Sequence, residues 1–377
     1  MNKTIDEPHP EASSRLEQIG QLRARLTDLL LDAETLWKQS DEVTIAFRGH
    51  LNQDSEQAYT ILRERFAEIG YTPMLRARDG YDVVIALRHV FEQKQTHWSV
   101  NLILFLLTLM TTTLMGAVLE QGERLVQNHR LFFQQPELLL TGLPAAMTII
   151  SILGVHELAH YVVARKHGLD SSLPFFIPVP LGLGTLGAII RIHTPWENRK
   201  ALFDVGIAGP LAGFVVALPI FIIGMFISPI EPVVPGTASL QAPLLLQWIE
   251  HWTESVRGIP SGYDTYLNTV TFAAWFGLIV TGVNLLPIGQ LDGGHVIYAL
   301  LGQWAQIVGI AVLAAIAVLG ALVWNGWYIW AAFIMFSGWR HPPPLNNVAP
   351  LGKKRAIIGL LVLALTALLF TPAPFAL

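Results

Sequence analysis

The sequence predicts a mostly helical protein that crosses a membrane several times and carries a small soluble α+β domain at its N-terminus. Of its 377 residues, 52% are hydrophobic and only 14% are charged, whereas about a quarter of the residues of a soluble protein are charged. Apolar runs of spanning length begin only after residue 96. We therefore expect an all-α polytopic membrane protein, with a soluble domain at 1–96 and a transmembrane domain at 97–377.

Residues 1–96 are expected to form an N-terminal helix followed by a β-α-β-β unit. Apolar side chains recur at three- and four-residue intervals from Ile19 to Leu36, which is typical of one helix face. The strand-like segment EVTIAFRGHL precedes an amphipathic helix over 54–69. Two further strands, YTPMLRAR and YDVVIALRHV, flank a turn at Asp79–Gly80. This domain shows no catalytic pattern.

Seven apolar runs follow, and six membrane crossings is the alternative because the sixth and seventh runs are short. The runs cover about 97–118, 138–165, 201–227, 269–288 continuing to 301, 304–324, 326–339 and 356–371.

The lysines and arginines between these runs predict the orientation. If the N-terminal domain is cytoplasmic, most of them lie on its side of the membrane, and only Arg124, Arg130 and Arg257 lie outside. Those on the inner side are Arg165, Lys166, Arg191, Arg199, Lys200, Arg340, Lys353, Lys354 and Arg355. The segment 228–268 is then external.

Composition excludes several classes of protein. The net charge of −4 and the absence of a basic stripe argue against a nucleic-acid partner. Without cysteine there is no disulfide or thiolate site, so any metal is held by His, Asp or Glu. The N-terminal MNKTIDEPHPEASS has neither an apolar secretory core nor an arginine-rich transit pattern. It predicts an integral protein of a prokaryotic plasma (inner) membrane, with a cytoplasmic N-terminus.

The second apolar run contains the pattern HELAH, residues 156–160. Two histidines four residues apart lie on one helix face, so His156 and His160 can bind the same ion, and Glu157 sits beside that ion to handle a proton. Ionisable groups at this depth are costly and usually have a function. The alternative is a pair of membrane histidines satisfied by neighbouring helices, which leaves the position of the glutamate unexplained.

A catalytic zinc ion takes three protein ligands and leaves one position open. Asp292 is the strongest candidate for the third ligand because it is the only acid in the membrane segments after 268. His295 is the rival candidate. We expect Pro287 before Asp292, and Gly293–Gly294 after it, to break the helix and turn the carboxylate inward.

HELAH followed by NLLPIGQLDGG resembles the site-2 protease family of intramembrane zinc metalloproteases, whose signatures are HExxH and N-x-x-P-x-x-x-L-D-G. The resemblance covers about 138–301, the expected catalytic core. It implies one Zn²⁺ per chain held by His156, His160 and Asp292, with Glu157 as the catalytic acid and base. It also implies that Asn284 holds the substrate or polarises its carbonyl group, although an asparagine here could equally bond two helices together.

Two further segments match this family. GAIIRIHTP, 187–195, lies where the family has a membrane-associated strand, which could pair with an unwound substrate or be an ordinary interfacial loop. GIAGPLAGF, 206–214, matches a Gly-Pro motif, although many members have asparagine at the position of Gly213. The short external loop leaves no room for a PDZ domain. The chain therefore resembles the branch shared by cyanobacteria and chloroplasts.

The function that these patterns predict is hydrolysis of peptide bonds in or near transmembrane helices, with single-span membrane proteins as substrates and the lipid bilayer as surroundings. The alternative is a transporter or channel that uses the same histidines and aspartate to translocate a metal ion or a proton. The hydropathy profile shows no inverted repeat, and a translocation site has no need for Glu157 beside a ligand.

Overall fold

The computed structural model describes residues 10–36, 44–89, 97–122, 134–233 and 239–376, together with 124, 127, 128 and 130. The chain forms two compact units. The N-terminal unit comprises 1–93, 194–200 and 343–351, and the membrane unit comprises 94–193, 201–342 and 352–377. The expected domain boundary at 96 and 97 adjoins residues 90–96, which lie outside the described residues.

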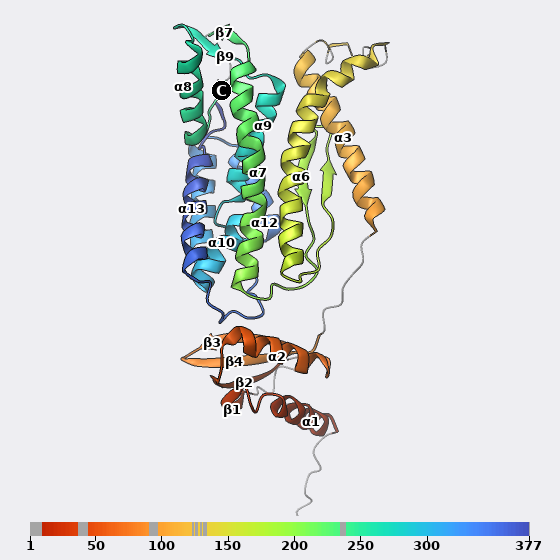
Figure 1. The fold of residues 1–377 in the computed structure, drawn as a ribbon, viewed down its shortest axis with the longest axis vertical. Helices are drawn as coiled ribbons and strands as arrows, with labels where there is room; N and C mark the ends of the chain where they lie inside the picture. The colour runs from red at the N-terminus through yellow and green to blue at the C-terminus, as the bar shows by residue number, and fades with distance from the viewer. Residues whose placement is uncertain are drawn as a thin grey trace, which may run out of the picture. The chain divides into compact units, whose positions relative to one another are not determined.

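The N-terminal unit is built on a four-stranded antiparallel sheet with strand order β1-β2-β4-β3 (Figure 1). Its elements are α1 (Pro10–Ala24), β1 (Leu30–Leu36), β2 (Thr44–Leu51), α2 (Ser55–Ala67), β3 (Thr72–Arg78) and β4 (Tyr81–Leu87). Asp54 caps α2 by accepting a hydrogen bond from the backbone of Glu56. Asp79 and Gly80 both have positive φ, as a two-residue hairpin turn requires.

The expectation of one helical stripe from Ile19 to Leu36 is wrong. The helix ends at Ala24, and the last part of the stripe forms β1, which pairs with β2 from Leu30 opposite Leu51. A helical spacing of apolar residues is only a local signal, and here the pairing with β2 overrides it.

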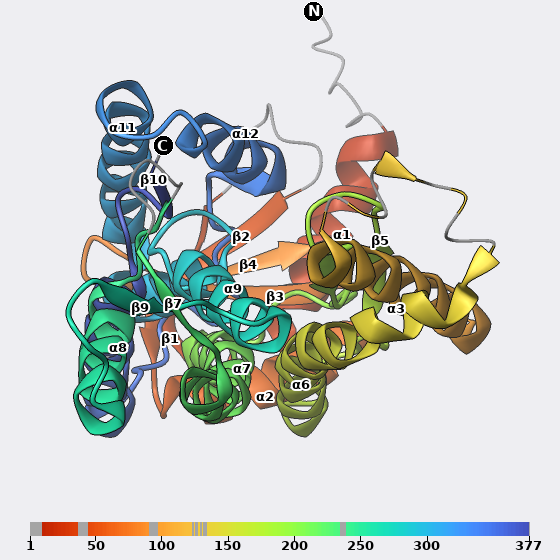
Figure 2. The ribbon, with the colours of Figure 1, turned by 90° about the horizontal axis from the view of Figure 1, so that it is seen from above.

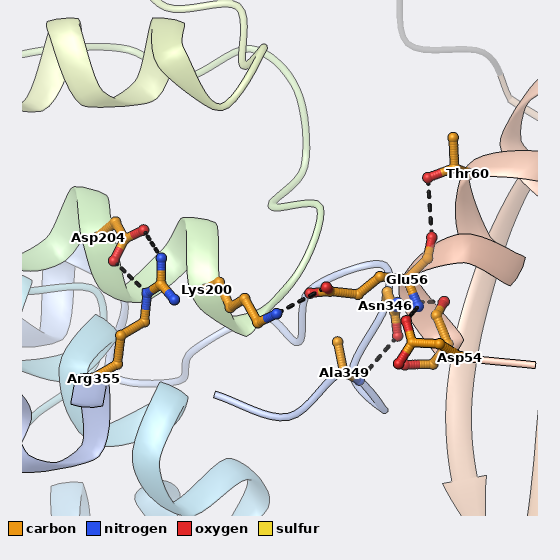
Figure 3. A network of polar contacts seen from close by, with 9 residues as sticks. Asp54, Glu56, Thr60, Lys200, Asp204, Asn346, Ala349 and Arg355 are labelled. Atoms are coloured by element: carbon orange, nitrogen blue, oxygen red, sulfur yellow. Dashed lines mark hydrogen bonds and ion pairs between the residues drawn. The ribbon is translucent and has the colours of Figure 1, made fainter. Parts of the chain in front are cut away.

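Two loops from the membrane half of the sequence belong to the N-terminal unit. Leu75 of β3 donates its backbone N–H to Leu345 (2.8 Å) and accepts one from Asn347 (3.1 Å), so residues 345–347 extend the sheet. The side chain of Asn346 is buried and donates to the carbonyl of Ser55. From the other loop, Lys200 pairs with Glu56 at 2.8 Å (Figure 3). The sequence analysis did not anticipate these contacts.

The membrane unit is mostly helical. Its helices are α3 (Trp98–Gln121), η1 (Pro136–Gly142), α6 (Leu143–Lys166), α7 (Arg199–Ile227), α8 (Leu244–Arg257), α9 (Thr269–Asn284), α10 (Asp292–Leu301), η2 (Gly302–Trp304), α11 (Ala305–Leu322), α12 (Trp327–Gly338) and α13 (Lys353–Leu369). Its strands are β5 (Phe175–Pro178), β6 (Thr185–Ile189), β7 (Ile230–Pro232), β8 (Ser239–Leu240), β9 (Tyr263–Thr265) and β10 (Phe375–Ala376). Of the expected strand region 187–195, only residues 187–189 belong to a strand, β6, which forms a hairpin with β5.

Four helical stretches of the described residues are long and apolar enough to cross a membrane. They are Trp98–Gln121, Pro136–Lys166, Arg199–Ile227 and Asp292–Leu322. Two apolar helices are shorter: Thr269–Asn284 lies between the third and fourth of these stretches, and Trp327–Phe336 follows the fourth. The continuous run expected from 269 to 301 is broken, because α9 ends at Asn284 and α10 begins only at Asp292.

Three helices of the membrane unit are joined at one end by an ionic cluster. Asp204 of α7 accepts two hydrogen bonds from Arg355 of α13, at 2.7 and 2.8 Å (Figure 3). The imidazole of His167, directly after α6, lies 3.0 Å from the same carboxylate. The cluster fixes the start of α7 beside the end of α6, and this is the end of α6 that carries the histidines.

Candidate metal centre

Helix α6 carries His156, Glu157 and His160 on its buried side. Pro144 stands in its first turn, and the chain leaves it at Gly168, whose φ of +70° suits the residue after a helix. All three functional side chains are almost completely inaccessible to solvent. The helical spacing that the sequence predicted thus places both imidazoles on the same side of one helix.

Asp292, the first residue of α10, meets these two histidines. Its Oδ2 lies 3.3 Å from His156 Nε2, and its Oδ1 lies 3.3 Å from His160 Nε2. The two Nε2 atoms are 3.1 Å apart. These three residues are the one group among the described residues whose ligand atoms could hold a metal ion together.

The spacing of the three ligand atoms fits zinc. A tetrahedral zinc ion has bonds of about 2.0–2.2 Å to imidazole nitrogen and carboxylate oxygen, so its ligand atoms lie about 3.3 Å apart. The 3.1 Å between the two Nε2 atoms, and the 3.3 Å from each of them to its nearer carboxylate oxygen of Asp292, are close to that edge. Two imidazoles and one carboxylate leave the fourth position open, as in a catalytic site.

Helix α7 orients His160. The Nδ1 atom of His160 lies 2.7 Å from the backbone carbonyl of Val205, so Nδ1 carries the proton and Nε2 faces the other ligands. The α7 backbone also comes unusually close here. A Cβ atom added at Gly209 would overlap the imidazole of His160, and one added at Gly213 would lie 3.3 Å from His156 Nδ1.

The segment between α9 and α10 positions Asp292 beside the two histidines. The expectation that Gly293 and Gly294 break the helix is wrong, because both lie inside the first turn of α10. They are needed for another reason. The preceding loop folds back on this turn, so a Cβ atom at Gly293 would overlap the carbonyl of Leu285 and one at Gly294 would overlap that of Gly289. The actual break lies within 285–291, where Gly289 has φ +57°.

Glu157 lies beside the three ligands without belonging to them. Its Oε1 is 4.0 Å from His156 Nε2. The backbone of Ile190, directly after β6, approaches the same carboxyl group. Glu157 therefore lies between the candidate metal position and the strand hairpin.

The rival ligand His295 points elsewhere. Its Nδ1 lies 2.6 Å from Nε2 of His341, and the His341 ring stacks on Tyr298 with centroids 4.6 Å apart. His193 does not belong to the ligand group either, and its Nδ1 lies 3.2 Å from Asp170. Asn284 is half-buried at the end of α9, and among the described residues its side chain has no hydrogen-bond partner.

Sequence reasoning missed Val205, Gly209 and His341. The spacing of Gly206, Gly209 and Gly213 could have indicated a small-residue face that allows close helix approach. No sequence signal connects a backbone carbonyl such as that of Val205 to a particular imidazole.

The comparisons with known proteins agree with this geometry. Residues 144–323 match the model of the family described as Peptidase family M50. The chain is 34% identical over 248 residues to "Probable zinc metalloprotease EGY2, chloroplastic" of Arabidopsis thaliana, which is 65% of this chain and 44% of that protein. It is 28% identical over 390 residues to "Probable zinc metalloprotease EGY1, chloroplastic" of the same plant, covering 91% of this chain and 70% of that protein.

A rice relative, the EGY2 protein of Oryza sativa subsp. indica, is 26% identical over 324 residues, 79% of this chain and 57% of its own length. The chain thus spans about half the length of the EGY2 relatives that it matches.

These relatives correct the expected location. All of them are named as chloroplastic, which overturns the assignment to a prokaryotic plasma membrane. The lysine and arginine pattern distinguishes the two faces of a membrane, but it does not distinguish one membrane from another.

The matched segment contains α6, α7, α9 and α10 with both motifs, and it is the part of the chain in which the two histidines and the aspartate converge. Residues 144–323 of the chain thus match peptidase family M50, the site-2 protease family.

Proposed function

We propose that the protein is an intramembrane zinc endopeptidase that hydrolyses peptide bonds within or near the transmembrane helices of single-span membrane proteins. The convergence of His156, His160 and Asp292, with Glu157 directly beside them, carries this proposal. The transporter alternative is disfavoured, since it gives Glu157 no role. The names of the relatives support a chloroplast membrane as the location.

A zinc ion bound by these residues supplies the Lewis acidity that polarises the scissile carbonyl group and activates a water molecule. Glu157 accepts the proton of the attacking water and delivers it to the leaving amine. Val205 keeps the Nε2 atom of His160 available as a ligand. Asn284, whose amide has no partner among the described residues, is placed by this proposal at the substrate carbonyl.

The β5–β6 hairpin supports a mode of substrate binding. The carbonyl groups of a transmembrane helix are bonded within the helix, so the helix must unwind before its peptide bond can react. Strand β6 belongs to a two-stranded sheet, so one of its edges is available to an extended peptide. The chain leaves β6 at Ile190, next to Glu157. A peptide added to this edge would run toward the catalytic glutamate.

We infer seven membrane crossings, made by α3, α6, α7, the broken pair α9 and α10, α11, α12 and α13. The four candidate spans and the two shorter apolar helices contain all of these helices except α13, with α10 and α11 joined in one stretch. Helix α13 is added because its 17 residues are mostly apolar. A compact unit cannot lie on both faces of a bilayer, so residues 194–200 and 343–351 lie on the side of the N-terminal sheet. This assignment agrees with the distribution of lysine and arginine between the helices.

The direct test is cleavage by the purified protein. The full chain in detergent is incubated with a candidate single-span substrate, with and without a zinc chelator, and fragments are separated by mass. We expect fragments that disappear with the chelator and return when zinc is added. Fragments that persist after complete removal of zinc would exclude a zinc peptidase.

A further inference from the structure

Helix α8 has three distinct faces. Leu246 and Thr253 are completely buried on the side that packs on the membrane unit. A second face is apolar and exposed, and it consists of Leu244, Trp248, Trp252 and Val256. These four residues are spaced by four and form a stripe along the helix. The third face is polar and exposed, and it includes Gln247, His251 and Ser255. Trp248 and Trp252 are 56% and 53% accessible, which is unusual for tryptophan on a surface that faces only water.

The C-terminal end of α8, called its outer end here, lies at the same level as the C-terminal end of α7. Arg257, the last residue of α8, donates hydrogen bonds of 2.6 Å to the carbonyls of Met225 and Ser228. The ring of Trp252 contacts that of Phe226 edge to face, with centroids 5.6 Å apart. Helix α7 has 29 residues, about 43 Å, so its end lies near the headgroups of a bilayer about 40–45 Å thick.

The N-terminal end of α8, called its inner end here, lies at the same level as the C-terminal end of α13. Helix α8 packs on α13, and the backbone of Gln241, just before α8, donates to Pro374, just after α13. Figure 1 shows α8 upright beside one end of α7, with α13 continuing its line toward the other end of the unit. Figure 2 shows α8 and α7 side by side from above. From Arg257, α8 therefore extends about 21 Å toward the interior of the membrane.

Helix α13 is short for a membrane span. Its 17 residues extend about 25 Å, less than the hydrocarbon thickness of about 30 Å. With α8 above it, the two helices together match the length of α7. Helix α8 occupies the part of the membrane thickness that α13 does not reach.

Polarity along α8 follows this depth. The inner half, Leu244–Ile249, is apolar apart from Gln247, whose amide donates to the carbonyl of Ala242 at 2.8 Å. His251 and Ser255, in the outer half, are the exposed polar residues nearer the headgroup level. Next to the stripe, Ile223 and Ile227 of α7 are also exposed, so the apolar surface of a candidate span continues onto α8. The aromatic rings at this level are typical of a membrane interface.

We propose that α8 is a half-membrane helix, seated with its inner end in the hydrocarbon region and with the stripe Leu244, Trp248, Trp252 and Val256 against lipid acyl chains. The occupant of this face is the bilayer. Within the segment 228–268, which the sequence alone suggested to be an external loop, Leu244–Arg257 is then a re-entrant part of the membrane domain. This inference does not depend on catalytic activity.

The absence of native cysteine makes the test simple. Single variants Trp248→Cys and His251→Cys of the full chain are labelled with a bimane fluorophore and reconstituted into phosphatidylcholine vesicles. Fluorescence is measured with brominated acyl chains, which quench from within the bilayer, and with aqueous iodide. We expect brominated lipid to remove most of the fluorescence at position 248 and iodide to remove little of it. Position 251 is expected to show the opposite preference.

Two outcomes would overturn the proposal. Strong quenching by iodide at position 248 would show that the stripe faces water. Protection from both quenchers, accompanied by disulfide-linked dimers of Trp252→Cys, would show that a second copy of the chain covers it. Leu244→Cys lies on the same face and replaces Trp248→Cys if loss of the indole prevents folding.

Discussion

The backbone of Gly209 on α7 lies directly against the imidazole ring of His160 on α6. We expect Gly209→Ala to displace this ring from its position beside Asp292. Zinc affinity should fall by about 10- to 100-fold, the usual cost of disturbing the residues that orient a ligand. The measurement is zinc bound per chain at a series of buffered free zinc concentrations. Gly154→Ala on α6 is the matched control, because its added Cβ atom meets only the ring of Phe176 at 3.7 Å. Equal affinity in the two variants would contradict this packing.

Asp292 and His295 differ in their expected effect on metal content. Asp292→Ala removes a carboxylate that lies 3.3 Å from both Nε2 atoms, so bound zinc should be lost. His295→Ala removes the partner of His341 and should retain about one zinc per chain. Elemental analysis of the purified variants measures this. Loss of zinc in His295→Ala, with retention in Asp292→Ala, would assign the third ligand to the histidine.

Labelling of cysteines tests the inferred topology. Cysteines placed at Glu68 in the N-terminal unit and at Pro350 in the loop that packs on it should react with an impermeant maleimide from the same side of sealed vesicles. A cysteine at the exposed Tyr266 should react only from the opposite side. Labelling of positions 68 and 266 from one side would overturn the topology.

Local patterns predicted those parts of the site that depend on local geometry. His156 and His160 needed only the four-residue repeat of a helix, and Asp292 was the only acid in the later membrane segments. The packing of α7 on these histidines was not predictable, because it depends on contacts between residues about fifty positions apart. For the same reason the sheet extension at Leu345 and the strand at Leu30–Leu36 were missed, since both are stabilised by pairing with distant segments.

The central claim is that Glu157 moves the protons of peptide hydrolysis beside a metal that it does not bind. Glu157→Gln keeps the size of the side chain but cannot accept a proton at neutral pH. The residues His156, His160 and Asp292 remain unchanged in this variant.

The deciding measurement compares Glu157→Gln with the wild type in parallel assays of zinc content and substrate fragments. We expect about one zinc per chain in both proteins, and a rate of fragment formation in the variant lower by at least the 10²–10⁴ typical of general acid–base catalysis. Fragments formed by the zinc-loaded variant at the wild-type rate would contradict the account.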